Sequence, residues 1–334
     1  MAAAPLLEVK GLVKHFPLKA GIGAPRQVVR AVDQIDFRVY SGETLGVVGE
    51  SGCGKSTTAR LLMNLIEPTA GEIIFDGCRV GSRDLPLKEF RRQVQMVFQD
   101  SYASLNPRMT IEDSIAFGAR VHGTSADAAL KRAHELLDRV GLEPRRFAGR
   151  YPHELSGGQR QRINIARALA LQPRLVILDE AVSALDKSVE AQVLNLLLDL
   201  KQDFGLTYVF ISHDLHVVRY ISDRVMVMYL GEVVEVGEAQ ALFEAPLHPY
   251  TRALTESMPS MDPDNRTEKV PLTGDPPNPI NPPAGCRFHP RCPVAAGVCG
   301  SRSPVLQTVG SAGMAACLIH QPDSGYGAPE VAAP

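Results

Sequence analysis

Gly49-Glu50-Ser51-Gly52-Cys53-Gly54-Lys55-Ser56, continued by Thr57, satisfies the G-x-x-x-x-G-K-[ST] spacing of a phosphate-binding loop. The apolar residues 45–48 predict a buried strand before it, and residues 58–63 predict a helix after it, which is the context that the motif requires. The glycines let several backbone N–H groups face one anion, and the helix start adds free N–H groups and a positive dipole end. We therefore expect nucleotide phosphates here, with Lys55 reaching the β- and γ-phosphates and the Ser56 hydroxyl ligating Mg²⁺.

The composition is that of an ordinary globular protein and excludes several classes. Of 334 residues, 45% are hydrophobic and 22% are charged, which suits one large domain with a smaller one appended. The formal net charge of -2 predicts no broad basic surface, so nucleic acid is not an expected partner. We expect no secretory signal, because no basic region precedes an apolar core near the N-terminus. No apolar run approaches the roughly 18 residues of a membrane span, so any membrane role is expected to be through partners.

Alternating strands and helices predict an α/β fold with a mostly parallel sheet and an N-terminal β-region. Strands are expected at residues 6–10, 28–40, 71–77, 94–98, 175–178 and 207–211, with a loop at 21–25 and a hairpin around Leu230-Gly231. Residues 105–171 predict a helical subdomain inserted into the core. A helix after the strand at 175–178 is expected to have an inward apolar stripe, formed by Val189, Val193, Leu196, Leu197 and Leu200. We expect a domain at residues 1–260 and an extension at 261–334, where eight of the 25 prolines fall within 23 residues.

An acidic pair, Asp179-Glu180, follows the apolar strand at residues 175–178. In α/β sheets the carboxyl ends of the strands are where ligands bind. Together with the phosphate loop, the pair predicts that Asp179 holds Mg²⁺ and that Glu180 polarises the water that attacks the γ-phosphate. Alone, such a pair would more often simply end a strand at the surface.

A second anion-binding pattern, Leu155-Ser156-Gly157-Gly158-Gln159, precedes a predicted helix. One nucleotide does not need two phosphate cradles from one chain. With this motif the sequence resembles the nucleotide-binding subunits of ATP-binding cassette (ABC) transporters, whose signature is Leu-Ser-Gly-Gly-Gln. The resemblance spans residues 6–237 and implies a head-to-tail dimer, in which the signature loop of each subunit closes on the ATP of the other. It also implies an ATP-hydrolysing enzyme.

The resemblance implies roles for further residues of this chain. Phe16 matches the aromatic that stacks on adenine, although spacing alone is equally consistent with a core residue. Gln99 matches the glutamine that senses Mg²⁺ and the attacking water, and His213 matches the switch histidine that helps to hold Glu180. Ser156, Gly157, Gly158 and Gln159 would contact ATP in trans, and Asp186 would lie at the dimer interface. One departure is Ala181, where many relatives have proline, and we expect from it only a small effect on loop stiffness.

Two further stretches narrow the resemblance to ATPases of bacterial dipeptide, oligopeptide or nickel importers, of the second-ATPase type. These are residues 104–110 and His248-Pro249-Tyr250-Thr251, which a proline- and cysteine-rich tail follows. The implied partners are a second, distinct ABC ATPase, two transmembrane permease subunits and, indirectly, an extracytoplasmic substrate-binding protein. The implied location is the cytoplasmic face of the inner membrane. Alternatives are an importer for nickel or another small solute, and a soluble ABC ATPase of DNA repair or translation.

Four of the six cysteines form a tail pattern, Cys286-x5-Cys292-x6-Cys299-x17-Cys317. Without an export signal they argue against a disulfide framework. Their spacing fits a zinc ribbon poorly, whereas four thiolates suit an iron–sulfur cluster. Members of the resembled importer family carry a [4Fe-4S] cluster here, so we expect that cofactor, with Zn²⁺ or unligated thiols as alternatives. Cys53 is either an alkylatable thiol activated by Lys55 and the helix dipole or simply a small residue that fits.

Overall fold

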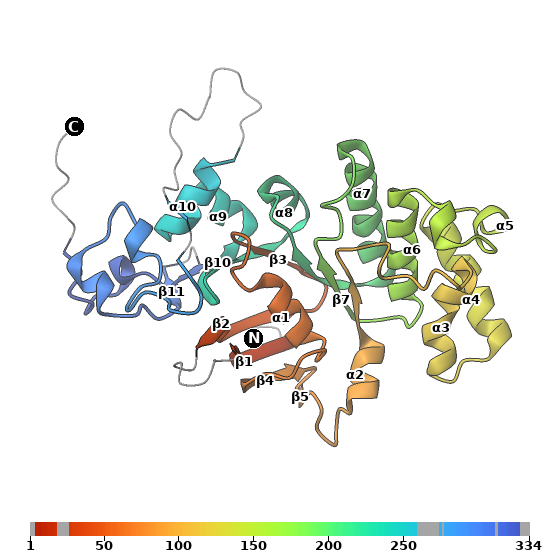
Figure 1. The fold of residues 1–334 in the computed structure, drawn as a ribbon, viewed down its shortest axis with the longest axis horizontal. Coiled ribbons are helices and arrows are strands. Elements are labelled where there is room, and N and C mark those ends of the chain that lie inside the picture. Colours follow the sequence, from red (N-terminus) through yellow and green to blue (C-terminus); the bar gives the residue numbers. More distant parts are fainter. Residues whose placement is uncertain (1–3, 19–26, 259–273, 276, 311–312, 328–334) are drawn as a thin grey trace.

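The computed structural model describes residues 4–18, 27–258, 274–275, 277–310 and 313–327. The predicted loop at residues 21–25 and the expected domain boundary between residues 260 and 261 lie outside these ranges. Two sheets organise the described residues, and α1 (Lys55–Leu62) lies between them (Figure 1). The α/β fold is confirmed.

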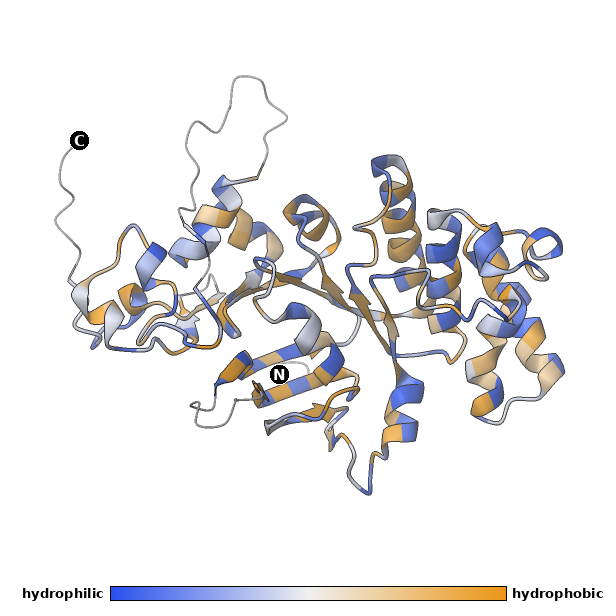
Figure 2. Ribbon diagram, viewed as in Figure 1, coloured by the Kyte–Doolittle hydropathy of each residue, from blue (hydrophilic) through white to orange (hydrophobic). Residues whose placement is uncertain are grey.

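The larger sheet has eight strands in the order β11-β12-β10-β9-β3-β8-β7-β6. Its parallel part runs from β9 to β6, and every residue of β3, β7 and β8 is buried, which explains their continuous apolar sequence. These central strands are mostly hydrophobic in Figure 2. The bounds are β3 Thr44–Val48, β6 Val94–Val97, β7 Leu175–Asp179, β8 Thr207–Ile211, β9 Arg224–Tyr229 and β10 Glu232–Glu238.

The smaller sheet is antiparallel, with the order β2-β1-β4-β5. Its strands are β1 Pro5–Pro17, β2 Val28–Tyr40, β4 Ala70–Phe75 and β5 Cys78–Arg79, so β1 extends well beyond the predicted residues 6–10. Alternate residues of β2 are buried at Ile35, Phe37 and Val39, as expected for a sheet that is covered on one face. This face shares a hydrophobic core with α1 and β3, which includes Val47 and Leu61.

Helices at residues 105–171 form the predicted helical region at one end of the molecule (Figure 1). They are α3 Ile111–Val121, α4 Ala126–Arg139, α5 Pro144–Phe147, a 3-10 turn at Pro152–Glu154, and α6 Gly157–Leu169. The side chains of Thr110 and Ser125 cap α3 and α4, and Gly141 follows α4 with a positive φ of 75°. The predicted stripe on α7 (Lys187–Phe204) is buried at Val193, Leu197 and Leu200, with Leu194 as an additional buried member.

The remaining helices connect the strands. They are α2 Leu87–Gln93, α8 Leu215–Ile221, α9 Ala239–Glu244 and α10 Pro249–Glu256. The hairpin predicted around Leu230-Gly231 joins β9 to β10. Within the described ranges, no helix is both long and apolar enough to cross a membrane.

The C-terminal tail lies at the other end of the molecule and continues the larger sheet (Figure 1). Two short 3-10 turns, at His289–Arg291 and Gly297–Gly300, precede β11 (Gln307–Val309) and β12 (Gly313–Ala315), and a third turn follows at Leu318–His320. β12 pairs antiparallel with β10, with Val236 opposite Met314. The proline-rich composition predicts a tail without long helices, and the helices in the part of the tail that the structure describes are all short 3-10 turns. The composition does not indicate the pairing of β12 with β10.

Candidate nucleotide site

The phosphate loop lies at the carboxyl end of β3 and leads into α1. Gly49, Gly52 and Gly54 have φ values of 148°, 80° and 110°, which L side chains rarely adopt. A Cβ atom on Gly49 would lie 2.2 Å from the Met228 carbonyl oxygen, and one on Gly54 would lie 2.3 Å from that of Ala31. Conformation therefore favours glycine at all three positions, and space also requires it at Gly49 and Gly54.

Lys55 is buried inside the loop and is only 5% exposed. Its Nζ donates to the carbonyl oxygens of Gly49 at 2.7 Å and Glu50 at 3.0 Å. The ammonium group thus lies within the curve of the loop, where it can meet an anion. Cys53 lies 3.8 Å from this Nζ, but it is 3% exposed and burial raises its pKa. The alternative of an activated, alkylatable Cys53 is therefore wrong, and the residue is a small buried side chain.

Ser56 and Asp179 meet across the base of the site. The Ser56 Oγ donates to Asp179 Oδ1 at 3.1 Å, although 123 residues separate them in sequence. Burial raises the pKa of Asp179, and the hydrogen bond from Ser56 acts in the opposite direction. A hydroxyl and a carboxylate suit Mg²⁺, which takes few protein ligands and completes its shell with water and substrate phosphates.

Glu180 is held by two residues from other elements. The Gln99 Nε2 donates to Glu180 Oε2 at 2.8 Å, and His213 Nδ1 lies 3.5 Å from the same oxygen. The backbone of Glu180 has a φ of 49°, which is uncommon for a residue other than glycine. Its N–H donates to the Ile211 carbonyl at 2.9 Å, which fixes this unusual conformation. An acid with an imposed conformation and two polar neighbours is suited to orienting a water molecule.

The phosphate loop and Glu180 with its two neighbours line one cavity of about 400 Å³. Most of the residues predicted to bind nucleotide or Mg²⁺ within this chain border it: Ser51, Gly52, Gly54, Lys55, Ser56, Thr57, Gln99, Glu180 and His213. Gly49, Cys53 and Asp179 are not in its wall. Val29, Ala31 and Pro279 also line it, and no sequence pattern indicated them. Pro279 comes from the tail, and its carbonyl accepts from the Arg30 N–H at 3.1 Å.

Phe16 does not line this cavity, but it is not a core residue either. It is 38% exposed near the end of β1, with the Lys14 Nζ at 5.1 Å from its ring centroid. The alternative that Phe16 is core is therefore wrong. Adenine stacking by Phe16 stays a prediction.

The signature residues Ser156 to Gln159 lie apart from the cavity, at the start of α6. The Ser156 Oγ accepts from the Gln159 N–H at 3.3 Å, and the Gln159 side chain accepts from the Ser156 N–H at 3.0 Å. Ser156 is exposed, as is Asp186 at the start of α7. A Cβ atom on Gly158 would lie 2.5 Å from Val189 Cγ1, so this glycine allows α6 to approach α7 closely.

The four tail cysteines gather around a second, much smaller cavity of about 20 Å³. Burial raises the pKa of Cys286, Cys292 and Cys317 to about 11 each. Among the residues described, no group of three or more His, Cys, Asp or Glu side chains is arranged to hold a metal ion. The three thiols with raised pKa values are therefore mostly protonated at neutral pH, and the described residues offer no arranged set of metal ligands.

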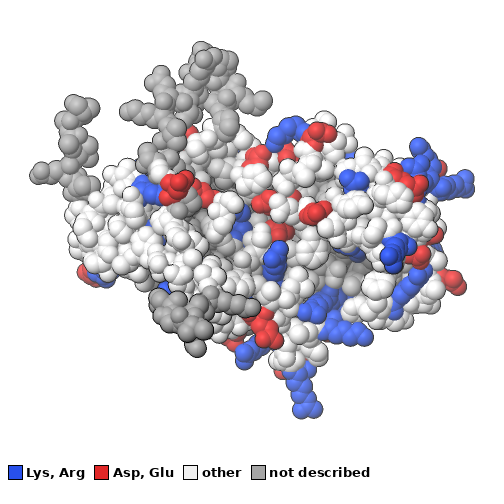
Figure 3. Space-filling view, in the orientation of Figure 1, with Lys and Arg blue, Asp and Glu red and all other residues white. Residues whose placement is uncertain are grey.

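Acidic and basic side chains are intermixed on the face drawn in Figure 3. This distribution agrees with the near-neutral net charge. It offers no continuous basic surface on that face for a nucleic-acid backbone.

The geometry defines a phosphate-loop ATPase whose second cradle, Ser156 to Gln159, lies outside its own nucleotide cavity. Comparison with known proteins agrees: the model of the ABC transporter family matches residues 32–183, and that of the oligopeptide/dipeptide transporter C-terminal region matches residues 234–299. The chain belongs to the ATP-binding proteins of the ABC transporter family and is an ATP-hydrolysing transporter subunit.

Its relatives include a probable peptide ABC transporter ATP-binding protein of Sinorhizobium fredii, 52% identical over 95% of this chain and 90% of that protein. The oligopeptide transport ATP-binding protein AppF of Bacillus subtilis is 49% identical over 94% of this chain and 97% of AppF. Among solved structures, a dimeric ATP-binding cassette in a post-hydrolysis state with ADP and phosphate matches with a TM-score of 0.60. That chain is 30% identical, and the match covers 70% of this chain and 98% of the other.

Proposed function

We propose that this chain energises the import of peptides through a membrane ABC transporter. The supporting observations are the match of residues 234–299 to the oligopeptide/dipeptide transporter C-terminal region and, separately, the pairing of β12 in the tail with β10 of the ATPase sheet. The relatives named for peptide or oligopeptide transport, which match over almost the whole chain, also support it.

The test is ATP-dependent uptake by the reconstituted transporter. The chain would be assembled in vesicles with the permease subunits and binding protein encoded beside it, and labelled dipeptides, oligopeptides and Ni²⁺ would be compared. We expect peptide accumulation that needs ATP. Uptake of Ni²⁺ or another small solute without peptide uptake would contradict the proposal, as would co-purification with nucleic acid in place of membrane subunits.

We propose the following roles for the residues of the nucleotide site. Lys55 and the loop N–H groups bind the phosphates, while Ser56 and Asp179 would hold Mg²⁺. When bound, this ion neutralises phosphate charge. Glu180 acts as the general base for water, and Gln99 and His213 hold its carboxylate in position. Phe16 would stack on adenine, and Ser156 to Gln159 would close on the ATP of a partner subunit, with Asp186 at the interface.

We also propose that Cys286, Cys292, Cys299 and Cys317 hold a [4Fe-4S] cluster. The support is their convergence on one cavity, and a cluster would help to fold a tail that is rich in proline and has no long helix among its described residues. Purified protein is expected to absorb broadly near about 400 nm, as iron–sulfur chromophores do, and to contain iron and labile sulfide. A colourless preparation that contains zinc, or neither metal, would contradict it.

The proposed assembly follows from this role. A second, distinct ABC ATPase and two permease subunits are the direct partners, and an extracytoplasmic binding protein acts indirectly. The chain would then lie peripherally on the cytoplasmic face of the inner membrane. Affinity purification of the chain from membranes should recover the permease subunits, and their absence would argue against this assembly.

A further inference from the structure

The phosphate loop has a feature that ATP binding does not explain, the carboxylate of Glu50. It belongs to the second residue of a loop that must receive several negative phosphate oxygens. An unpaired carboxylate there would repel ATP. Its backbone is nevertheless part of the cradle, since the Glu50 carbonyl accepts from the Lys55 ammonium at 3.0 Å.

The tail supplies the counter-charge. The two terminal nitrogens of Arg291 donate to the two carboxylate oxygens of Glu50, at 2.7 and 3.0 Å, across 241 positions of sequence. The Arg291 side chain is 6% exposed and that of Glu50 is 24% exposed. The hydrogen bonds to Glu50 raise the pKa of Arg291, so the guanidinium stays charged. A bidentate arginine–carboxylate ion pair that is mostly shielded from water is strong, and it fixes the relative position of its two side chains.

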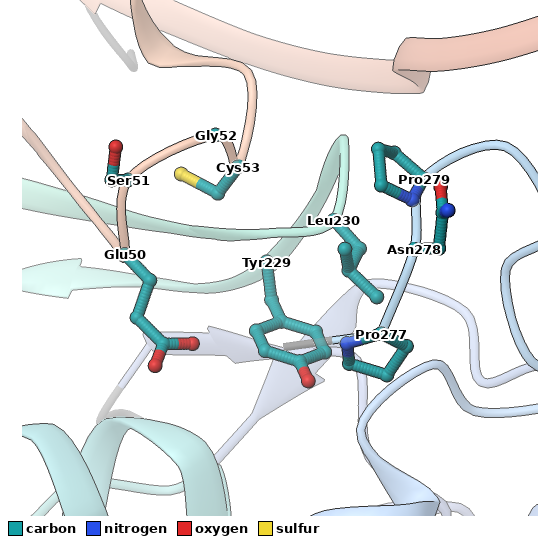
Figure 4. A pocket seen from close by; sticks show the side chains of 9 residues that line it. All are labelled: Glu50, Ser51, Gly52, Cys53, Tyr229, Leu230, Pro277, Asn278 and Pro279. Carbon is teal, nitrogen blue, oxygen red and sulfur yellow. The ribbon is translucent and has the colours of Figure 1, made fainter. Parts of the chain in front are cut away.

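The loop depends on few contacts on this side. A cavity of about 410 Å³ lies between residues 50–53 and Pro277 to Pro279, with Tyr229 and Leu230 also in its wall (Figure 4). Residues 50–53 therefore lack close packing against much of this wall. Besides Arg291, the polar contacts here include the Tyr250 hydroxyl, which accepts from the Glu50 N–H at 3.0 Å, and the Gly231 N–H, which donates to the Cys53 carbonyl at 2.9 Å.

Arg291 is itself held firmly. It ends the 3-10 turn His289–Arg291, its N–H donates to the Phe288 carbonyl at 2.9 Å, and Phe288 is buried. The same short segment carries Arg287, which binds Asp33 and the Leu230 carbonyl and lies 2.9 Å from Glu232. The segment is thus anchored to β2 and to the β9–β10 turn independently of the phosphate loop.

We propose that Arg291 is a positioning residue for ATP binding, which neutralises the Glu50 carboxylate and holds the phosphate loop in its anion-binding shape. Arg291 touches neither the reacting atoms nor the cavity in which they lie. It acts through Glu50. The C-terminal tail is thereby part of the nucleotide site, and ATP affinity depends on it.

The test is ATP binding by the purified full-length chain, measured with a fluorescent ATP analogue and Mg²⁺, in a double-mutant cycle of Arg291→Met, Glu50→Gln and the double variant. Arg291→Met leaves a carboxylate unpaired, so we expect affinity about tenfold weaker, which is about 1.4 kcal/mol. Glu50→Gln/Arg291→Met removes that carboxylate and is expected to recover most of the affinity. The matched control is Arg302→Met, in a tail residue whose side chain donates to the Asp323 carbonyl.

A structural role alone would give a different pattern. It would lower thermal stability in Arg291→Met and in the double variant alike, and the double variant would bind ATP no better than the single one. That result, or unchanged affinity in Arg291→Met, would overturn the proposal. If Arg291→Met does not fold, Arg291→Lys keeps the charge but loses the two-pronged contact. We expect a several-fold weaker affinity with unchanged kcat at saturating ATP, and unchanged affinity would likewise overturn it.

Discussion

The N-termini of α1 and α6 are both glycine-rich and both contain a serine, yet their free backbone N–H groups are used differently. At α1, Gly54 is in a left-handed conformation, no side chain among the described residues caps the helix, and the loop opens into the 400 Å³ cavity. At α6, Ser156 and Gln159 satisfy each other's backbone N–H groups, and Ser156 is exposed. The N-terminus of α1 thus leaves its backbone N–H groups for an anion from solution, whereas the side chains of α6 itself already satisfy two of the N–H groups at its N-terminus.

This difference suits a divided nucleotide site. A loop with open donors binds ATP within its own chain. The capped, exposed N-terminus of α6 can contact the ATP bound by a partner subunit, and it does so only when the two subunits close. Four predictions, from the largest expected effect to the smallest, test whether the N-terminus of α1 serves ATP binding and that of α6 serves dimer closure.

Glu180→Gln should remove hydrolysis and keep binding at the α1 site. The amide preserves shape and hydrogen bonding to Gln99 but cannot accept a proton, so we expect kcat of the assembled transporter to fall by about 10²- to 10⁴-fold. ATP affinity of the isolated chain should stay within about threefold. The matched control is Glu238→Gln, in an exposed carboxylate that precedes α9. Undiminished turnover in Glu180→Gln would exclude Glu180 as the base.

Ser156→Arg should block closure at the α6 site. A long cation there would collide with the facing subunit, so we expect ATPase activity of the assembled transporter to fall by about 10²-fold, the scale of one lost transition-state donor. This chain should still bind ATP. The control is Ser125→Arg, because Ser125 also caps a helix from an exposed position but belongs to α4. Loss of ATP binding in the isolated Ser156→Arg chain would instead place Ser156 in its own site.

The N-termini of α1 and α6 also differ in how much of their structure and role the sequence predicts. The phosphate loop and the acidic pair are local patterns, and the strand before each one fixes where it lies in a parallel sheet. The trans role of Ser156 needs a second chain, which no periodicity describes. Pairing of β12 with β10, and of Arg291 with Glu50, joins segments far apart in sequence. Such contacts depend on tertiary packing, and hydrophobic pattern does not specify them.

Gly158→Ala should lower stability through the contact of α6 with α7. Its Cβ would lie 2.5 Å from Val189 Cγ1, and overpacking of this kind costs about 1–3 kcal/mol of unfolding free energy. Gly157→Ala is the control, because its Cβ would lie 3.9 Å from the nearest atom, in Leu185. Urea unfolding measures both. Val189→Ala should restore the stability of Gly158→Ala, and failure to do so would mean that the cost does not come from this contact.

Ser156→Gly should separate the two roles of the Ser156 hydroxyl, which are capping α6 and contacting the ATP of a partner subunit. Glycine is a tolerated N-cap, so the unfolding free energy should fall by only a few tenths of a kcal/mol, as it should in Ser125→Gly. If the Ser156 hydroxyl contacts the partner's ATP, hydrolysis by the assembled transporter should nevertheless fall in Ser156→Gly and not in Ser125→Gly. Equal activity in the two variants would mean that Ser156 only caps α6. The trans contacts would then have to come from the N–H groups of Gly157 and Gly158, which would make the start of α6 resemble that of α1.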